Sequence, residues 1–303
     1  MPPTAGAVEP IPLMTTADPR AVPAASRLGV VTVSYRSGDV LGPMLGSIKD
    51  ATHSDVYGIV ADNAGEESIR QLAEKMGYHY LTLPNPGYGA AVNAAIGVVP
   101  AGIEWIVISN PDVRFSPGSI DQLLSAADDP TIGAVGPRIL DDDGVVYPSA
   151  RAIPSLRTGI GHALFSRIWP ANPWTRRYHR SGLLEMDEPT DAGWLSGSCL
   201  LVRRTAFEAI GGFDERYFMY FEDVDLGYRL GKAGFRNRYQ PRSLVHHIGG
   251  TSTQAHSVEM TAEHHRSASL FVARKYRGVI LSPLRLVIDV GLRVRSALAT
   301  RRR

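Results

Sequence analysis

Two groups of acidic residues have the types and spacing to bind a metal or to accept a proton. Asp112 ends the sequence Asn110 to Asp112 after an apolar run, where a carboxylate can hold Mg²⁺ or Mn²⁺ on a diphosphate. It can equally be an ordinary turn aspartate beside proline. Glu222 to Asp225 follow five large apolar residues, surroundings that raise a carboxylate pKa and suit a general base. The alternative for this second group is helix capping.

Histidines and glycines supply two further candidate sites. The adjacent His246 and His247 have side chains that can ligate a metal or donate to a phosphate, and which of the two would be the ligand is open; a histidine pair is also a common structural feature. The following Gly249-Gly250 would let backbone amides approach an anion.

The glycine-containing block from Asn85 to Asn93 has part of a dinucleotide-binding fingerprint. Gly87 and Gly89 have the required spacing, but Val92 replaces the third glycine, and no acidic residue ends a strand about 20 residues later. A nicotinamide site is therefore not expected. A glycine turn that leads into a helix beside a nucleotide fits the same residues.

Apolar runs alternate with helix-like stretches in the first half of the chain. We expect strands at residues 28–34, 56–61, 78–83 and 105–108, and helices at 66–76, 89–98 and 117–127. Ser116 would cap the last helix, with Pro117 as its first residue. This alternation predicts an α/β fold with a mostly parallel sheet and crossover helices, and ligands bind at the carboxyl ends of such strands.

The second half of the chain is less regular. Residues 148–190 contain several prolines, two tryptophans and a basic run that includes Arg176 and Arg177, so we expect an irregular flap or acceptor region. Two alternatives are open for these arginines: they contact an acceptor, or they belong to a solvated loop. A strand at 194–202, helices at 204–210 and 222–233, a short strand at 244–247 and helical sequence from about residue 258 complete the prediction.

Composition limits the function classes. The 303 residues include 44% hydrophobic residues, and the formal net charge of +2 gives no indication of a nucleic-acid partner. A single cysteine, Cys199, excludes a disulfide within the chain and fits a cytosolic protein. Residues 1–26 are rich in Pro, Ala and Thr and lack signal-peptide features, so we expect a disordered tail. No run of about 18 apolar residues indicates a membrane span.

The C-terminal residues 256–303 are expected to be helical and basic. From Pro283 onward the arginines far outnumber the acids, and the apolar residues are spaced along one helical face. A basic amphipathic helix suits an anionic membrane surface. The alternative is a helix packed on the domain with a frayed, arginine-rich end.

These clusters, in this order, resemble the family 2 inverting glycosyltransferases over residues 28–255. The resemblance implies a GT-A (Rossmann-like) fold with a mostly parallel central sheet flanked by helices, a catalytic domain at 27–255 and C-terminal helices. It implies a donor nucleotide-sugar site, a bound Mg²⁺ or Mn²⁺ ion and inversion by a single displacement. The implied donor-site residues are Ser34, Tyr35, Asp62, Asn63, Asn85, Gly87, Gly89, Asn93 and Asn110.

The resemblance also assigns the metal, the base and the acceptor side. Asp112 and His246 would hold the metal, and Asn110 departs from the family by replacing the first acid of the Asp-x-Asp motif. Asp223 would be the catalytic base. The acceptor would meet Trp194, Gly197, Glu222, Arg176 and Arg177.

Within the family, residues 162–180 and 194–204 are similar to the actinobacterial rhamnosyltransferases of cell-wall linker synthesis. This likeness implies transfer of L-rhamnose from dTDP-L-rhamnose to polyprenol-linked N-acetylglucosaminyl diphosphate, by an enzyme held peripherally at the inner face of the membrane. A related transferase that uses another nucleotide sugar, such as a UDP-sugar, is the first alternative. A catalytically silent nucleotide-sugar binding module is the second. The oligomeric state is open, and a homodimer is possible.

Overall fold

The structure is a computed structural model that describes residues 27–155, 186–248 and 257–278, together with Pro283, Leu286, Val290 and Gly291. Several expectations fall outside these residues: the tail at 1–26, most of the flap with Arg176 and Arg177, the pair Gly249-Gly250 and nearly all of the basic segment after residue 278.

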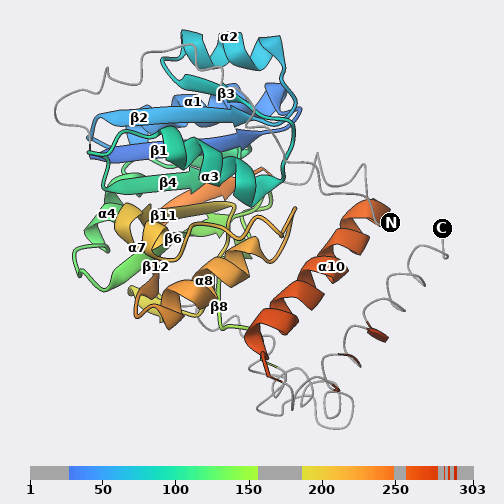
Figure 1. The fold of residues 1–303 in the computed structure, drawn as a ribbon. Coiled ribbons are helices and arrows are strands. Elements are labelled where there is room, and N and C mark those ends of the chain that lie inside the picture. Colours follow the sequence, from blue (N-terminus) through green and yellow to red (C-terminus); the bar gives the residue numbers. More distant parts are fainter. Residues whose placement is uncertain are drawn as a thin grey trace, which may run out of the picture.

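A large sheet with helices on both faces organises the molecule (Figure 1). The strands of the first half are β1 (Leu28–Ser34), β2 (Val56–Asp62), β3 (His79–Thr82), β4 (Trp105–Ser109), β5 (Val113–Phe115), β6 (Ile132–Leu140), β7 (Val146–Tyr147) and β8 (Ala150–Arg151). Those of the second half are β9 (Thr190–Ala192), β10 (Trp194–Leu195), β11 (Cys199–Arg203) and β12 (Arg236–His247). The helices are α1 (Gly38–Ala51), α2 (Glu67–Lys75), α3 (Tyr88–Val98), α4 (Ser119–Ser125), α7 (Arg204–Ala209), α8 (Glu222–Lys232) and α10 (Ser257–Lys275).

The strand order confirms the predicted alternation of strands and crossover helices in the first half. The sheet runs β3-β2-β1-β4-β11-β6-β12-β5, and β1, β2, β3 and β4 are mutually parallel. β11 then runs antiparallel between β4 and β6, while β6 and β12 are parallel. Ser34 lies beside Asp62 in the register of β1 and β2, so the polar residues that follow these strands share one edge.

Two hydrophobic cores lie on the two faces of this sheet. Val31 and Ile59 point to one core with α3, α7 and α8, whereas Val30 and Val60 point to the other with α1, α2 and α4. Consecutive strand residues are thus buried on opposite faces, which explains the uninterrupted apolar runs in the sequence.

Several predicted boundaries are wrong: β12 begins at Arg236 and not at residue 244, and two further differences each have a local reason. Helix α4 begins at Ser119 and not at Pro117, because Gly118 has a φ of +70° and belongs to the turn that precedes the helix. The strand expected at 194–202 is broken into β10 and β11, and residues 196–198 between them cross the site described below. None of the described helices combines the length and hydropathy that crossing a bilayer would take.

Helix α8 packs directly on β10 through a glycine. A methyl group at Gly227 would lie 2.7 Å from the Cβ of Trp194, 2.8 Å from its Cα and 3.0 Å from the carbonyl oxygen of Gly193. Asp223 is one helical turn before Gly227 and therefore lies on the same face. The close approach at Gly227 sets how far the first turn of α8 stands from the strand.

We expect Gly227→Ala to lower the free energy of unfolding by about 1–3 kcal/mol, because overpacking against backbone atoms outweighs the higher helix propensity of alanine. Gly231→Ala, one turn later, is the matched control, since its methyl group would meet no atom within 4 Å. That variant should be as stable as the wild type or slightly more stable. Urea denaturation of both variants tests this expectation, and equal stabilities would contradict it.

Candidate active site

Asp223 lies in the first turn of α8 and is held by backbone amides. Its Oδ2 accepts a hydrogen bond from the Gly197 N–H at 3.0 Å, and its Oδ1 accepts one from the Val224 N–H at 2.8 Å. Burial raises the pKa of Asp223, and these amide hydrogen bonds oppose the rise. The side chain stays partly exposed, so a fixed carboxylate with raised proton affinity faces the outside.

The peptide of Gly197 connects three parts of the fold. Its N–H donates to Asp223, and its carbonyl accepts from the Tyr88 hydroxyl of α3 at 2.7 Å. The next carbonyl, that of Ser198, accepts from the Asn110 N–H at 2.8 Å. A methyl group at Gly197 would lie 3.3 Å from the Cβ of Asp223. The gap between β10 and β11 thus joins the base helix, the donor-side helix and the loop after β4.

Tyr88 links the carboxylates electrostatically. Burial is the main cause that raises its pKa well above the ordinary value, and the charges of Glu222, Asp223 and Asp112 add to the rise. All three carboxylates therefore act on one phenol. Asp112 and Asp223 are thus both near enough to Tyr88 for their charges to act on its hydroxyl.

The turn before α8 has a strained backbone. Tyr220 and Phe221 have φ values of 65° and 64°, a left-handed conformation that costs energy for bulky residues. Helix α10 covers this turn: the Ser267 hydroxyl donates to the Met219 carbonyl at 2.9 Å, and the rings of both aromatic residues contact His264. The C-terminal helix therefore helps to hold the turn that aims Asp223.

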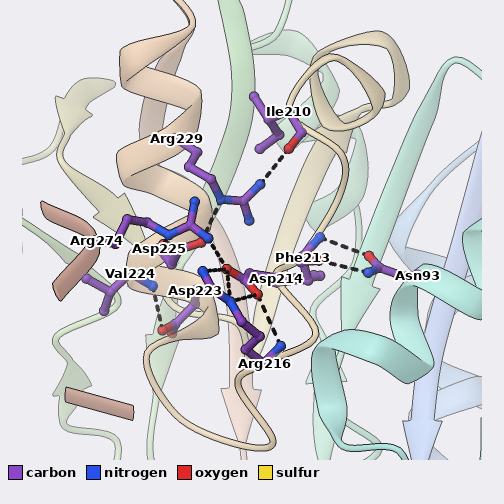
Figure 2. Close-up of polar contacts among 10 residues, drawn as sticks. All are labelled: Asn93, Ile210, Phe213, Asp214, Arg216, Asp223, Val224, Asp225, Arg229 and Arg274. Atoms are coloured by element: carbon purple, nitrogen blue, oxygen red, sulfur yellow. Dashed lines mark hydrogen bonds and ion pairs between the residues drawn. The ribbon is translucent and has the colours of Figure 1, made fainter. Parts of the chain in front are cut away.

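A buried ion-pair network anchors α10 to α8 (Figure 2). The fully buried Asp225 pairs with Arg229 through Oδ2 at 2.6 Å and with Arg274 of α10 through Oδ1 at 2.8 Å. Arg274 also contacts Asp214, which pairs with Arg216. Removing one partner of such a network leaves an uncompensated buried charge, so these contacts fix the position of α10.

Glu222 is buried immediately before the base. Its side chain is 7% exposed, and its Oε2 has no hydrogen-bond partner among the described residues. Burial first, and then the neighbouring charge of Asp223, raise the pKa of Glu222 to about 8. Glu222 therefore holds a proton at neutral pH, which keeps a second negative charge away from Asp223. The resemblance implies that Glu222 contacts the acceptor. What the structure shows is that burial favours the protonated form of its side chain.

On the other side of the site, Asp112 pairs with His247 and not with His246. The Nε2 of His247 lies 3.1 Å from the Oδ1 of Asp112, and the Ile248 N–H donates to the Asp112 carbonyl at 3.0 Å. His246 is exposed and lies across from Arg114 on β5. Neighbouring residues of a strand point to opposite faces, so His247 and not His246 is turned toward Asp112. No group of three metal-ligating side chains suited to an ion occurs in the described part of the chain.

Two expected donor-site residues serve the protein's own backbone. The buried Asp62 accepts hydrogen bonds from the N–H groups of Ala64 and Glu66 and from the Tyr80 hydroxyl, so it shapes the turn before α2. Asn93 accepts from the Phe213 N–H at 2.9 Å and donates to the Phe213 carbonyl at 2.9 Å (Figure 2). Both side chains are structural clamps in this arrangement.

The remaining donor-side residues keep groups available. The Oγ of the buried Ser34 and the Oδ1 of Asn63 have no partner among the described residues, and Tyr35 is 42% exposed. The Asn63 amide nitrogen donates to the Asn85 side chain at 3.3 Å. These four residues lie near the carboxyl edge of β1 and β2, as expected.

Close packing explains both glycines of the Asn85 to Asn93 block, against backbone atoms at Gly87 and against a side chain at Gly89. Gly87 has a φ of +101°, and a methyl group there would lie 2.5 Å from the Phe218 carbonyl oxygen. A methyl group at Gly89 would lie 2.9 Å from the Cβ of Phe213. The block therefore docks on the loop that leads to the base.

Of the residues expected to meet the acceptor, the structure describes Trp194, Gly197 and Glu222, and Arg151 lies beside Trp194. Trp194 is buried and lies directly opposite Arg151 in the pairing of β10 with β8. No sequence pattern pointed to Arg151, because a lone arginine after Ser149-Ala150 has no distinguishing signature. Tyr88 lies within the Asn85 to Asn93 block, but the sequence signature of that block comes from its glycines, so the pattern did not single out the tyrosine.

Comparison with known proteins gives consistent results. Residues 24–267 match the family described as Glycosyltransferase like family 2. The chain is 45% identical over 287 residues to the N-acetylglucosaminyl-diphospho-decaprenol L-rhamnosyltransferase of Mycobacterium tuberculosis, covering 90% of this chain and 93% of that one. It is 25% identical over 255 residues to the Rhamnosyltransferase WbbL of Escherichia coli K12, covering 81% and 92% of the two chains.

A solved structure supports the fold. The mannosyltransferase of Pyrobaculum calidifontis in complex with GDP-Man and Mn²⁺ superposes with a TM-score of 0.55 at 16% identity, over 95% of this chain and 75% of that one. At this identity the likeness shows the fold alone. It confirms the predicted α/β architecture.

The raised pKa of Glu222 predicts a pH-dependent stability. Between about pH 4.5, where the carboxyl titrates in the unfolded chain, and about pH 8, the folded protein holds a proton that the unfolded chain releases. The free energy of unfolding should therefore fall as the pH rises through this window. We expect Glu222→Gln to remove this dependence, so that the variant is more stable than the wild type at pH 8 and similar to it near pH 4.5.

Urea denaturation at several pH values measures this difference. Glu104→Gln changes an exposed glutamate at the opposite end of β4 and serves as the control. Parallel pH profiles for the wild type and the Glu222 variant would show that Glu222 is ionised in the folded state.

Proposed function

The chain belongs to the family 2 glycosyltransferases, and from this premise we propose that it transfers L-rhamnose from dTDP-L-rhamnose to polyprenol-linked N-acetylglucosaminyl diphosphate. The observation that carries the choice of substrates is the 45% identity to the mycobacterial rhamnosyltransferase, which extends over nearly the full length of both chains. The family membership confirms the resemblance seen in the sequence.

We assign the role of catalytic base to Asp223. A hydroxyl of the acceptor sugar gives its proton to the Asp223 carboxylate, and the oxygen forms a bond to the anomeric carbon of the donor. The bond from that carbon to the nucleoside diphosphate breaks, and the diphosphate leaves with the electron pair. A single displacement of this kind inverts the anomeric centre. The amide hydrogen bonds to Gly197 and Val224 fix the carboxylate, and its raised pKa improves proton acceptance.

Asp112 and His247 fit a divalent cation. A carboxylate oxygen and an imidazole nitrogen lie 3.1 Å apart at the edge of the sheet, and oxygen and nitrogen donors suit Mn²⁺ and Mg²⁺. Such ions usually take one or two protein carboxylates and complete their coordination with substrate phosphates, which agrees with the small number of protein ligands here. When bound, the cation would neutralise charge on the diphosphate. Asn110 offers an amide oxygen in place of the usual first carboxylate.

For the contact with the donor base we assign Asn63 rather than Asp62, both of them donor-site residues that the resemblance implies. The carboxylate of Asp62 accepts hydrogen bonds from the turn, whereas the amide oxygen of the neighbouring Asn63 has no partner among the described residues. Thymine presents both a donor and acceptors on its pairing edge, and an amide can match both. Tyr35 and Ser34 would complete the nucleoside contacts, with Asn85, Gly87 and Gly89 shaping the wall behind the sugar.

The lipid tail of the acceptor places the reaction at the inner membrane surface. A UDP-sugar as donor remains the first alternative. The silent binding module is disfavoured by the fixed, partly exposed Asp223.

The purified protein should add L-rhamnose to a short-chain prenyl-diphospho-N-acetylglucosamine when it is given dTDP-L-rhamnose. Mass analysis of the lipid product identifies the added sugar, and parallel reactions with UDP-sugars test the alternative. Asp223→Asn should lower the rate about 10²–10⁴-fold because proton removal is lost. Asp128→Asn, an exposed control, should keep full activity. Transfer from a UDP-sugar alone would overturn the donor assignment, and full activity of Asp223→Asn the base assignment.

The metal assignment is tested by binding rather than by turnover. Calorimetric titration with dTDP should show tighter binding in the presence of Mn²⁺, and Asp112→Asn and His247→Gln should each reduce that gain about tenfold or more. His246→Gln changes the adjacent, exposed histidine and should leave the gain intact. A loss with His246→Gln but not with His247→Gln would restore the ligand expected from the sequence.

A further inference from the structure

Arg151 of β8 lies near two aromatic rings, beside the strand β10 that carries Trp194. Its guanidinium carbon lies 5.5 Å from the centre of the Trp194 ring and 5.8 Å from that of Tyr147. Its Nε donates to the Pro148 carbonyl at 2.8 Å. A guanidinium near the faces of aromatic rings gains cation–π attraction, and its terminal N–H groups can still bind a ligand.

The position of Arg151 relative to the base follows from the pairing of the short strands. Arg151 lies opposite Trp194, and Trp194 packs on Gly227, one turn after Asp223 on α8. Three residues after Trp194, Gly197 donates its N–H to Asp223. The positive charge of Arg151 also acts on Asp223 and opposes the rise in its pKa that burial causes. Arg151 is therefore on the same side of the site as the base.

The charge of Arg151 is not neutralised by an ion pair in the described part of the chain. Arg229 of α8 and Arg274 of α10 differ from Arg151 in this respect, because both pair with Asp225. A half-buried cation without a protein carboxylate, next to a substrate site, is suited to an anionic group of the substrate. The carboxylate of Asp223 at the start of α8 would otherwise make this side of the site unfavourable for an anion.

We propose that Arg151 binds the diphosphate of the acceptor and so makes the enzyme select a sugar that carries a diphosphate near the attacking hydroxyl. This inference rests on the proposed function, since it concerns the acceptor of that reaction. A guanidinium can form two parallel hydrogen bonds to a phosphate, and this fixes the orientation of the sugar as well as its affinity. Lysine keeps the charge but not this geometry.

Acceptors with and without the diphosphate separate this role from others. The first acceptor is short-chain prenyl-diphospho-N-acetylglucosamine, and the second is an alkyl glycoside of the same sugar without phosphate. Arg151→Gln should raise the KM for the diphosphate acceptor about 10–100-fold and leave kcat and the donor KM nearly unchanged. With the alkyl glycoside, kcat/KM should stay at the wild-type level. Arg151→Lys should fall between the wild type and the Gln variant.

A control and a second readout keep the outcome decisive. Arg70→Gln removes the same charge from helix α2 and should leave the kinetics with both acceptors unchanged. If Arg151 serves only as a counter-charge for Asp223, the acidic limb of the pH profile would shift and both acceptors would lose rate equally. That result, or an unchanged KM for the diphosphate acceptor in Arg151→Gln, would overturn the proposal.

A binding measurement distinguishes failure of this inference from failure of the proposed function. Calorimetric titration of prenyl-diphospho-N-acetylglucosamine into the wild type and Arg151→Gln needs no donor and no turnover. Weaker binding to the variant would support the role of Arg151 even if rhamnose is not the sugar transferred. Equal binding would overturn it even if rhamnose is transferred.

Discussion

The peptide group of Gly197 is the constraint on which the candidate site depends. Its N–H holds the base of α8, and its carbonyl holds the phenol of α3, while the adjacent Ser198 carbonyl holds the loop that carries Asp112. These three elements are far apart in the sequence, and one short backbone segment fixes their separations. A side chain at this position would press on Asp223, so the absence of a Cβ is part of the geometry.

The strained turn before α8 gives the C-terminal helix a role in the catalytic domain. Two aromatic residues in the left-handed region are stable only when surrounding contacts hold them, and α10 supplies these through Ser267, His264 and the Arg274 ion pairs. The domain boundary expected at residue 255 would separate α10 from the turn before α8, although α10 contacts that turn. The family match, which extends to residue 267, includes the first part of α10.

Patterning predicted the parallel half of the sheet because β1, β2 and β4 are apolar on both faces, and the acids at the strand and helix ends predicted where polar chemistry would gather. A choice between His246 and His247 requires knowing which face of β12 each side chain is on. Leu244 and Val245 are both apolar, and a register irregularity between Gln240 and Leu244 hides the alternation. Asp62 and Asn93 show a different limit, since a polar side chain that binds its own backbone has the same sequence signature as one that binds a ligand.

Asp223 and Asp225 show how environment divides the work of two identical side chains. They are two residues apart on one helix, and burial raises the pKa of both. Asp225 is fully buried, and its charge is offset by Arg229 and Arg274, so it serves to join two helices. Asp223 receives only backbone N–H groups and stays partly exposed, so a proton can reach it. Because no arginine pairs with it directly in the described part of the chain, its proton affinity can rise as a base requires, while Arg151 remains nearby to receive an anionic substrate.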